Sequence, residues 1–399
     1  FVYRKLIVLI TDKTEDQDRI KNIQGFAEKK GVYLKLIESF GSSTEFISEE
    51  VLTKKITEDA NILQKSKQIV IWTKENAGLN ALSRFIQNNP KSVFNQKSIV
   101  ILENNIDRNL SRIQRQFELI KAKTIIVAKE GSTESLIESS DEDQFINILK
   151  ERGYEFAVVD AQSGKLRPWN FISYFVNILV DNGIPDNTIA LLLLLPVIAT
   201  VVAFTRQVIG ITTYGIYTPS IITLSFLIIG IQAGLMTLLI AIGVGLLTKP
   251  LLKRVRMLFI PKMAIVLTVV SFTLLLILIS GIYMNLFNAQ FVSIAIFPML
   301  ILGTLVEKFV STKTESGFSS ATVLMGETLV VSIIAYFIAG GEIDLWFISF
   351  KFEFIKNLML TYPETVILLL IINIMLGKWS GLRVLERIRF REVLRHIEE

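Results

Sequence analysis

The apolar second half of the sequence carries a few side chains that could do chemistry inside a membrane. They are the charged residues Arg206, Glu307, Lys308 and Glu327, with the polar Gln207 next to the arginine. Charge at membrane depth is costly, so such residues suggest a function by default. The hypothesis is a network between Arg206 and a carboxylate that lines a polar cavity or forms a switch. The alternative is that Arg206 extends to the interface and that Glu307 pairs with Lys308 there.

The segment 210–219 is the second candidate, because it combines helix-breaking residues with polar ones. Its residues of interest are Gly210, Tyr214, Gly215, Tyr217, Thr218 and Pro219. Glycine and proline free backbone groups that must be satisfied within the protein, which is how broken helices form sites in transporters. The segment therefore predicts a broken-helix site. The alternative is an ordinary loop that runs into a helix.

The residue types that most catalytic sites need are scarce. The sequence has no cysteine, and its only histidine, His396, lies in the charged C-terminal tail. Disulfide scaffolds, thiolate metal sites and cysteine nucleophiles are excluded. A Ser-His-Asp triad or a histidine metal site would need a better placed histidine. We therefore expect no metal and favour binding and coupling over catalysis, and the residues identify no cofactor.

The net charge of +5 arises from one half of the chain. Residues 1–186 contain 26 Lys and Arg against 26 Asp and Glu, whereas the rest contains 16 against 11. Residues 187–306 contain no Asp or Glu at all. The basic pI of 9.1 thus reflects the membrane half and does not indicate binding to nucleic acid.

Basic residues gather in one loop and in the C-terminal tail. They are Lys249, Lys253, Arg254, Arg256, Lys262, Arg383, Arg389 and Arg391. Such clusters could contact anionic membrane lipids or a cytoplasmic protein partner. The alternative is that they only fix the orientation of the chain.

Seven apolar stretches have about the ~20 residues that cross a bilayer. They cover 187–205, 211–229, 232–247, 263–285, 290–306, 321–340 and 364–377. The aromatic stretches 169–180 and 345–360 are too short or interrupted and are typical of interfacial helices or hairpins.

The basic connections predict the orientation. They follow the third and seventh stretches, which end on the same side if every stretch spans the membrane. Since cytoplasmic loops are rich in Lys and Arg, the C-terminus is expected in the cytoplasm and the N-terminal domain outside it. If instead the start of the second stretch is re-entrant, one crossing is lost and the N-terminal domain lies inside.

The first half of the sequence predicts an α/β domain. Short apolar runs occupy 5–11, 32–37, 67–73, 97–103, 123–129 and 154–160, and amphipathic helices are expected over 15–30, 49–65, 79–89, 107–122 and 142–152. Runs in which apolar and polar residues do not alternate are typical of strands buried on both faces of a sheet. We therefore expect a doubly wound, mostly parallel, Rossmann-like sheet. The carboxylates at the strand ends mark either a ligand site or solvated loops. No glycine-rich phosphate loop follows a strand.

The predicted organisation is therefore a soluble domain over 1–164, an interfacial linker over 165–186, a seven-helix membrane domain over 187–377 and a basic cytoplasmic tail over 378–399. The membrane half also resembles a bacterial family of seven-transmembrane proteins that are usually fused to an inactive transglutaminase-like domain. The resemblance is carried by AFTRQVIGI at 203–211, YGIYTP at 214–219, IPKMAIVLT at 260–268, FP at 297–298, EKF at 307–309, ETL at 327–329, YPE at 362–364, LGKWSGLR at 376–383 and RFR at 389–391.

The resemblance covers about residues 185–395, and the α/β domain in front departs from it. The transglutaminase-like domain is either replaced here or lies upstream of Phe1. The resemblance implies a bacterial cytoplasmic (inner) membrane protein, and a partner from an ATP-grasp peptide ligase or protease system. Our leading hypothesis is a non-enzymatic membrane sensor or scaffold that couples an extracytoplasmic α/β domain to a cytoplasmic partner in signalling. The alternatives are a small-solute transporter with a site near 210–219 and Glu327, and a membrane enzyme that uses carboxylates.

Overall fold

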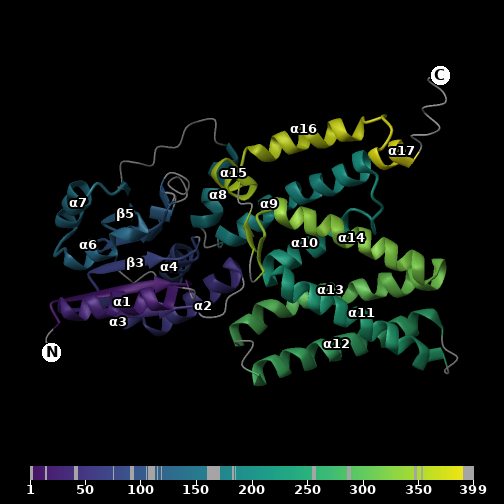
Figure 1. The fold of residues 1–399 in the computed structure, drawn as a ribbon, viewed down its shortest axis with the longest axis horizontal. Helices are drawn as coiled ribbons and strands as arrows, with labels where there is room; N and C mark the ends of the chain where they lie inside the picture. Colours follow the sequence, from purple (N-terminus) through teal and green to yellow (C-terminus); the bar gives the residue numbers. More distant parts are fainter. Residues whose placement is uncertain are drawn as a thin grey trace. The chain divides into compact units, whose positions relative to one another are not determined.

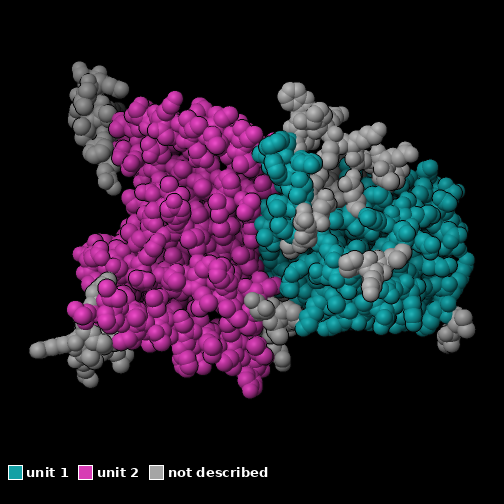
Figure 2. Space-filling view, turned by 180° about the vertical axis from the view of Figure 1, so that it is seen from behind, with its two compact units in different colours: residues 1–189, 360–362 teal, residues 190–359, 363–399 magenta. Residues whose placement is uncertain are grey.

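The chain folds into two compact units in a computed structural model (Figures 1 and 2). The structure describes residues 3–13, 16–39, 44–74, 76–89, 94–104, 106, 113–114, 116–117, 119–159, 171–181, 184, 186–253, 258–284, 289–345, 348–351 and 354–389. Unit 1 comprises residues 1–189 with 360–362, and unit 2 comprises residues 190–359 with 363–399.

Unit 1 is built on a six-stranded sheet. Its strands are β1 (Lys5–Thr11), β2 (Val32–Glu38), β3 (Gln68–Trp72), β4 (Ser98–Leu102), β5 (Thr124–Ala128) and β6 (Phe156–Val159). The strand order is β2-β1-β3-β4-β5-β6, and only β6 runs antiparallel to its neighbour. All six apolar runs are strands, which confirms the prediction of a mostly parallel sheet. The strand order reverses between β1 and β3, as in doubly wound sheets.

Helices cover both faces of this sheet. They are α1 (Gln17–Lys29), α2 (Glu45–Glu58), α3 (Ala60–Lys65), α4 (Ala77–Asn88), α6 (Thr133–Glu138) and α7 (Glu142–Glu151). Helix α8 (Phe171–Asp181) follows β6 in the chain, and its described side chains belong to neither buried cluster of the sheet. One buried cluster joins α2, α3 and α4 to one face of the sheet, and another joins α1, α6 and α7 to the other face. The two clusters explain why the strands are apolar on both sides.

The helix predictions for unit 1 differ from the structure in two places. The single helix expected over 49–65 is two helices that meet at Asp59, whose backbone (φ −94°, ψ 18°) departs from helical geometry. The short helix α6 was not predicted, since six residues are too few to show a helical period. Half of the residues of the helix predicted over 107–122 lie outside the described residues.

Unit 2 is a bundle of apolar helices. They are α9 (Asp186–Phe204), which begins in unit 1, then α10 (Tyr217–Ile229), α11 (Ile231–Lys253), α12 (Phe259–Tyr283), α13 (Ala289–Ser316), α14 (Phe318–Ile338), α15 (Phe354–Thr361), α16 (Thr365–Gly377) and α17 (Val384–Arg389). A two-stranded hairpin of β7 (Glu342–Leu345) and β8 (Ile348–Lys351) precedes α15. The hairpin and α15 occupy the aromatic stretch 345–360, and α8 occupies most of 169–180.

Each of the seven predicted spans contains a helix, but the helices differ in length. Five helices among the described residues are long and apolar enough to cross a membrane. The pair α15 and α16, bent by 119°, provides a sixth if it counts as one span, and α10 has only 13 residues. The second predicted span is short because residues 210–216 precede α10 as non-helical backbone.

Small residues allow α11 to approach its neighbours closely. A Cβ atom on Gly234 would lie 2.4 Å from Cδ1 of Phe226, and one on Gly245 would lie 2.2 Å from Cγ1 of Val306. Val306 is fully buried on α13. These contacts agree with the use of glycine at helix interfaces within membranes.

Candidate functional site

The candidate site is the connection between α9 and α10, here called the 210–216 segment. Helix α9 passes into a π-helical turn, Thr205–Ile209, whose first carbonyl accepts from the backbone N–H of both Gly210 (2.9 Å) and Ile211 (3.2 Å). Gly210 ends the turn with φ +95°, a left-handed conformation that favours glycine. A π turn and a left-handed glycine stop the helix and free the backbone groups that follow it.

Helix α14 satisfies those free backbone groups with side chains. The carboxylate of Glu327 accepts from the N–H of Thr212 (3.2 Å) and from the hydroxyl of the same residue. The next side chain, Thr328, accepts from the N–H of Tyr214 (3.2 Å) and is fully buried. Glu327 and Thr328, which are consecutive on α14, therefore hold Thr212 and Tyr214 of the segment in place. A bond from an N–H to a carboxylate is stronger than one to a neutral acceptor.

Helix α13 holds the start of α10. The ammonium of Lys308 donates to the hydroxyl of Thr218 (2.6 Å), which in turn donates to the carbonyl of Tyr214 (2.7 Å). Further along α10, the Thr223 hydroxyl donates to the carbonyl of Ser332 on α14 (3.0 Å). The polar residues between Gly210 and Pro219 are thus held by two neighbouring helices.

The beginning of the C-terminal segment lies against the π turn. The side-chain amide of Gln207 donates to the carbonyl of Trp379 (3.4 Å). The Arg383 side chain passes so close to Gly210 that a Cβ atom there would lie 3.1 Å from its Cβ. Gly210 is therefore required both by its backbone conformation and by this contact. Arg383, which the sequence suggests as a lipid or partner contact, is exposed and also contacts the π turn at Gly210.

The side chains of the other predicted site residues do not form hydrogen bonds with the 210–216 segment in the part of the chain that the structure describes. Glu307 is exposed on α13, and Arg206 is half-buried in the π turn. In the part of the bundle that the structure describes, no ion pair joins Arg206 to Glu307 or Glu327. Gly215 takes a left-handed conformation (φ +77°), and Tyr217 and Pro219 lie in the first turn of α10. Glu327 thus bonds to the 210–216 segment and not to Arg206.

Part of the predicted basic surface lies outside the described residues. The structure gives only the backbone of Lys249, Lys253 and Arg389, and Arg254, Arg256 and Arg391 are not described. Lys262 is half-buried in the first turn of α12. The contacts of this surface therefore stay a prediction.

Buried carboxylates also occur in unit 1, at the end of the sheet where a doubly wound fold binds its ligands. Asp12 follows β1 and accepts from the N–H of Lys74 (2.7 Å) and the hydroxyl of Ser48 (3.1 Å). Its burial raises the pKa of this carboxyl above the usual value, against the effect of these hydrogen bonds. Glu130, after β5, pairs with the ammonium of Lys13.

Glu49 is the functional candidate that the sequence did not reveal. It is 3% exposed on α2 and accepts from the side-chain amides of Asn80 (3.3 Å) and Asn187. Asn187 belongs to unit 1 and to the first turn of α9. In the sequence Glu49 is one of many acids on an amphipathic helix, and its partner lies 138 positions away, so no local signal marks it.

The carboxylates of Asp12, Glu49 and Glu327 accept hydrogen bonds from groups of the protein itself. Among the described residues, no group of three or more His, Cys, Asp or Glu side chains could hold a metal ion. At the 210–216 segment a single carboxylate bonds to backbone and hydroxyl donors. This arrangement can anchor a segment of backbone, and loss of the carboxylate as an acceptor would release it.

Comparison with known proteins gives one result. A family described as seven transmembrane helices usually fused to an inactive transglutaminase matches residues 180–394, which are 215 of the 399 residues. No curated protein and no solved structure shows significant similarity to the chain. The α/β unit lies almost entirely outside the match. With apolar helices throughout the matched region, the chain is an integral membrane protein that belongs to this seven-transmembrane family.

Proposed function

We propose that the protein is a non-enzymatic membrane sensor or scaffold, in which the α/β unit binds a ligand or protein and helix α9 passes the change to the bundle. The observation that carries this proposal is the continuity of α9. Its first turn holds Asn187, which donates to the buried Glu49, and its last turn leads into the π turn and the 210–216 segment.

Helix α9 suits this role because it runs as one helix of 19 residues, or about 28 Å, although it contains Pro196. A change that alters the bond between Glu49 and Asn187 acts on the start of this helix. The opposite end of the helix, at Phe204, continues into the π turn 205–209, which the 210–216 segment follows. Displacements of packed helices by 1–2 Å are a common form of conformational switching. The hydrogen bonds of Glu327 and Thr328 define one conformation of the segment, and a displacement of α9 could break them.

The output side of the proposal is cytoplasmic. The basic loop and tail, which include Lys262 and Arg383, would face the cytoplasm and bind anionic lipids or a protein partner, with the α/β unit outside. By family resemblance the partner class is an ATP-grasp peptide ligase or a protease. The proposed location is the inner membrane of a bacterium.

A small-solute transporter is the second candidate function. It is favoured by the non-helical backbone of the 210–216 segment within the bundle, a feature from which transporters build substrate sites. Against it, the Thr212 and Tyr214 amides already have protein partners. A transporter would need such groups for its substrate.

One comparison separates the two functions. The basic loop is neutralised by Gln at Lys249, Lys253, Arg254, Arg256 and Lys262, and proteins that co-purify from membranes are compared with the wild type. The proposal expects a cytoplasmic protein that is lost with the loop and kept when three exposed lysines of unit 1 (Lys21, Lys29 and Lys54) are neutralised instead. Uptake into reconstituted vesicles that Glu327→Gln abolishes, with no loop-dependent partner, would support the transporter instead.

A further inference from the structure

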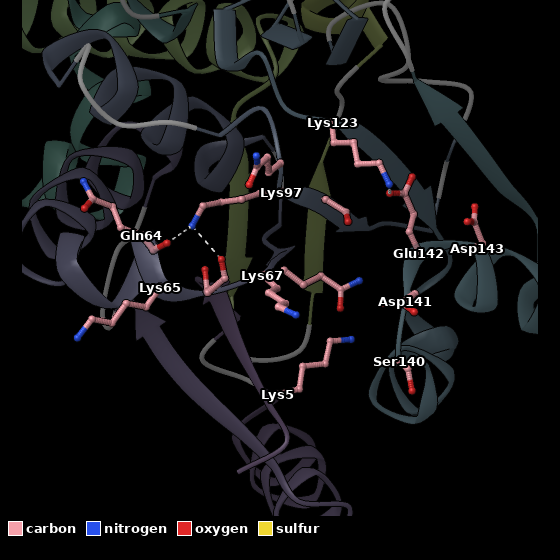
Figure 3. A pocket seen from close by; sticks show the side chains of 14 residues that line it. Lys5, Gln64, Lys65, Lys67, Lys97, Lys123, Ser140, Asp141, Glu142 and Asp143 are labelled. Carbon is pink, nitrogen blue, oxygen red and sulfur yellow. Dashed lines mark hydrogen bonds and ion pairs between the residues drawn. The ribbon is translucent and has the colours of Figure 1, made fainter. Parts of the chain in front are cut away.

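Unit 1 contains a cavity at the amino ends of its parallel strands. Asp12 lies at the opposite, carboxyl ends of these strands. The cavity has a volume of about 550 Å³ and is lined by Lys5 at the start of β1, Gln68 at the start of β3 and Ser98 at the start of β4. The first turn of α7 and the end of α3 complete its wall (Figure 3). Volumes of this size are typical of sites for small molecules.

The lining is strongly charged and has an excess of positive charge. Its lysines are Lys5, Lys65, Lys67, Lys97 and Lys123, and its acids are Asp141, Glu142 and Asp143. Five lysines against three acids leave a net charge of +2. In Figure 3 the side chains of Lys67 and Lys97 lie on one side of the cavity and those of Asp141 and Asp143 on the other.

Two of the five lysines have structural partners. Lys97 is 6% exposed and donates to the carbonyl oxygens of Leu63 (2.5 Å), Gln64 (2.7 Å) and Ser66 (2.8 Å), where α3 ends. Lys123 forms an ion pair with Glu142 (3.1 Å). These contacts fix the wall of the cavity, while the charge of Lys97 still contributes to its potential.

Lys5 and Lys67 are available to a ligand. Lys67 is exposed and forms no ion pair with any residue that the structure describes. Lys5 donates to the carbonyl of Ser139 (3.2 Å). Burial lowers the pKa of Lys5 to about 8; Asp141 opposes this shift, and the positive charges of Arg4 and Lys67 add to it. An anion beside these two lysines would relieve their repulsion.

Gln68 provides a second, independent indication of a ligand. Gln68 is 4% exposed and is one of the residues that line the cavity, and its buried Oε1 atom has no hydrogen-bond partner among the described residues. A buried acceptor without a partner is costly, and a bound molecule is one way to satisfy it. A ligand that does so offers a hydrogen-bond donor as well as negative charge.

We propose that this cavity binds a small phosphate monoester that carries hydroxyl groups. The phosphate lies against Lys5 and Lys67, and the hydroxyl groups donate to Oε1 of Gln68 and to the carboxylates of Asp141 and Asp143. A phosphate monoester carries a charge of about −1.5 to −2 at neutral pH, which matches the net charge of the lining. A zwitterion such as an amino acid would leave that charge uncompensated. The inference goes beyond the proposed function, because it needs only unit 1.

The test is calorimetric titration of the full-length chain in lipid nanodiscs with three probes: ribose 5-phosphate, ribose and inorganic phosphate. Ribose 5-phosphate is expected to bind, ribose to give no detectable heat, and inorganic phosphate to bind at least about tenfold more weakly. Lys67→Gln should weaken ribose 5-phosphate binding about tenfold or more. Lys21→Gln, which removes the same charge from an exposed position on α1, should leave binding unchanged.

A further variant tests the hydroxyl contacts. Gln68→Leu should bring the affinity for ribose 5-phosphate closer to the affinity for inorganic phosphate, because it removes the hydrogen-bond acceptor but leaves the lysines. The proposal is overturned if ribose 5-phosphate does not bind, or if Lys67→Gln and Lys21→Gln behave alike. Equal affinity for inorganic phosphate and ribose 5-phosphate would also overturn it. None of these results depends on coupling to the bundle, so the sensor proposal stands or falls separately.

Discussion

Glu327→Leu is expected to release the 210–216 segment from α14. The variant removes the acceptor of two hydrogen bonds from Thr212 and keeps a side chain of similar size. Hydrogen bonds to charged groups contribute about 1.5–3 kcal/mol, and 1.4 kcal/mol is a factor of about ten in an opening equilibrium. Amide hydrogen exchange in a peptide that covers 210–216 should therefore be about 10 to 150 times faster than in the wild type.

Two further variants show whether faster exchange comes from loss of the Glu327 hydrogen bonds. Glu307→Leu makes the same change at an exposed position of α13 whose carboxylate has no hydrogen bond to the described residues Thr212 and Tyr214, and exchange in the segment should not change. Glu327→Gln keeps an oxygen that can accept from the Thr212 N–H, so its effect should lie between those of the wild type and of Glu327→Leu. If Glu307→Leu accelerated exchange as much as Glu327→Leu, the effect would come from bundle packing and the anchor would not exist.

Gly245→Ala is expected to destabilise the bundle by about 1–3 kcal/mol, the usual cost of extra volume in a tightly packed core. The added Cβ atom would lie 2.2 Å from the Val306 side chain, which is fully buried between helices and has little room to move. The measurement is the free energy of unfolding, or the melting temperature, of the purified protein in detergent. The same packing should be restored by the double variant Gly245→Ala with Val306→Ala.

The chain supplies a matched control two residues away. A Cβ atom on Gly243 of the same helix would meet no atom within 4 Å. Gly243→Ala should therefore be neutral or stabilise the bundle by up to about 1 kcal/mol, because alanine favours the helix over glycine. Equal effects of the two alanine variants would show that the approach of α11 to α13 is not as close as the structure has it.

The α/β domain could be predicted because the signal is local. Strands buried on both faces leave continuous apolar runs, such as Ser98–Leu102, and the helices between them leave amphipathic patterns. The break at Asp59 could not be predicted, because the pattern of apolar residues continues across it. In the bundle, the length of the apolar stretches was enough to predict the helices. The 13 residues of α10 follow from the π turn and from Gly210, whose effect on helix length cannot be calculated from composition.

The candidate sites show where reasoning from sequence ends. The occurrence of Arg206, Glu307 and Glu327 within the apolar half suggested a network, but position along the sequence does not say which face of a helix a residue occupies. The structure turns Glu327 toward Thr212 and leaves Glu307 exposed. Likewise, the lysines that precede β3 and β4 look like ordinary strand starts, and only the parallel order of the sheet gathers them around one cavity.

The central claim is that the bond between Glu49 and Asn187 influences the 210–216 segment through α9. The direct test is amide hydrogen exchange of that segment in nanodiscs, with Asn187→Ala compared with Thr188→Ala, its exposed neighbour on the same helix. Coupling predicts that Asn187→Ala changes exchange in 210–216 by at least about threefold while Thr188→Ala leaves it unchanged. Identical exchange in the wild type and in Asn187→Ala, with Glu327→Leu still accelerating it, would contradict the coupling and leave the segment as a local anchor.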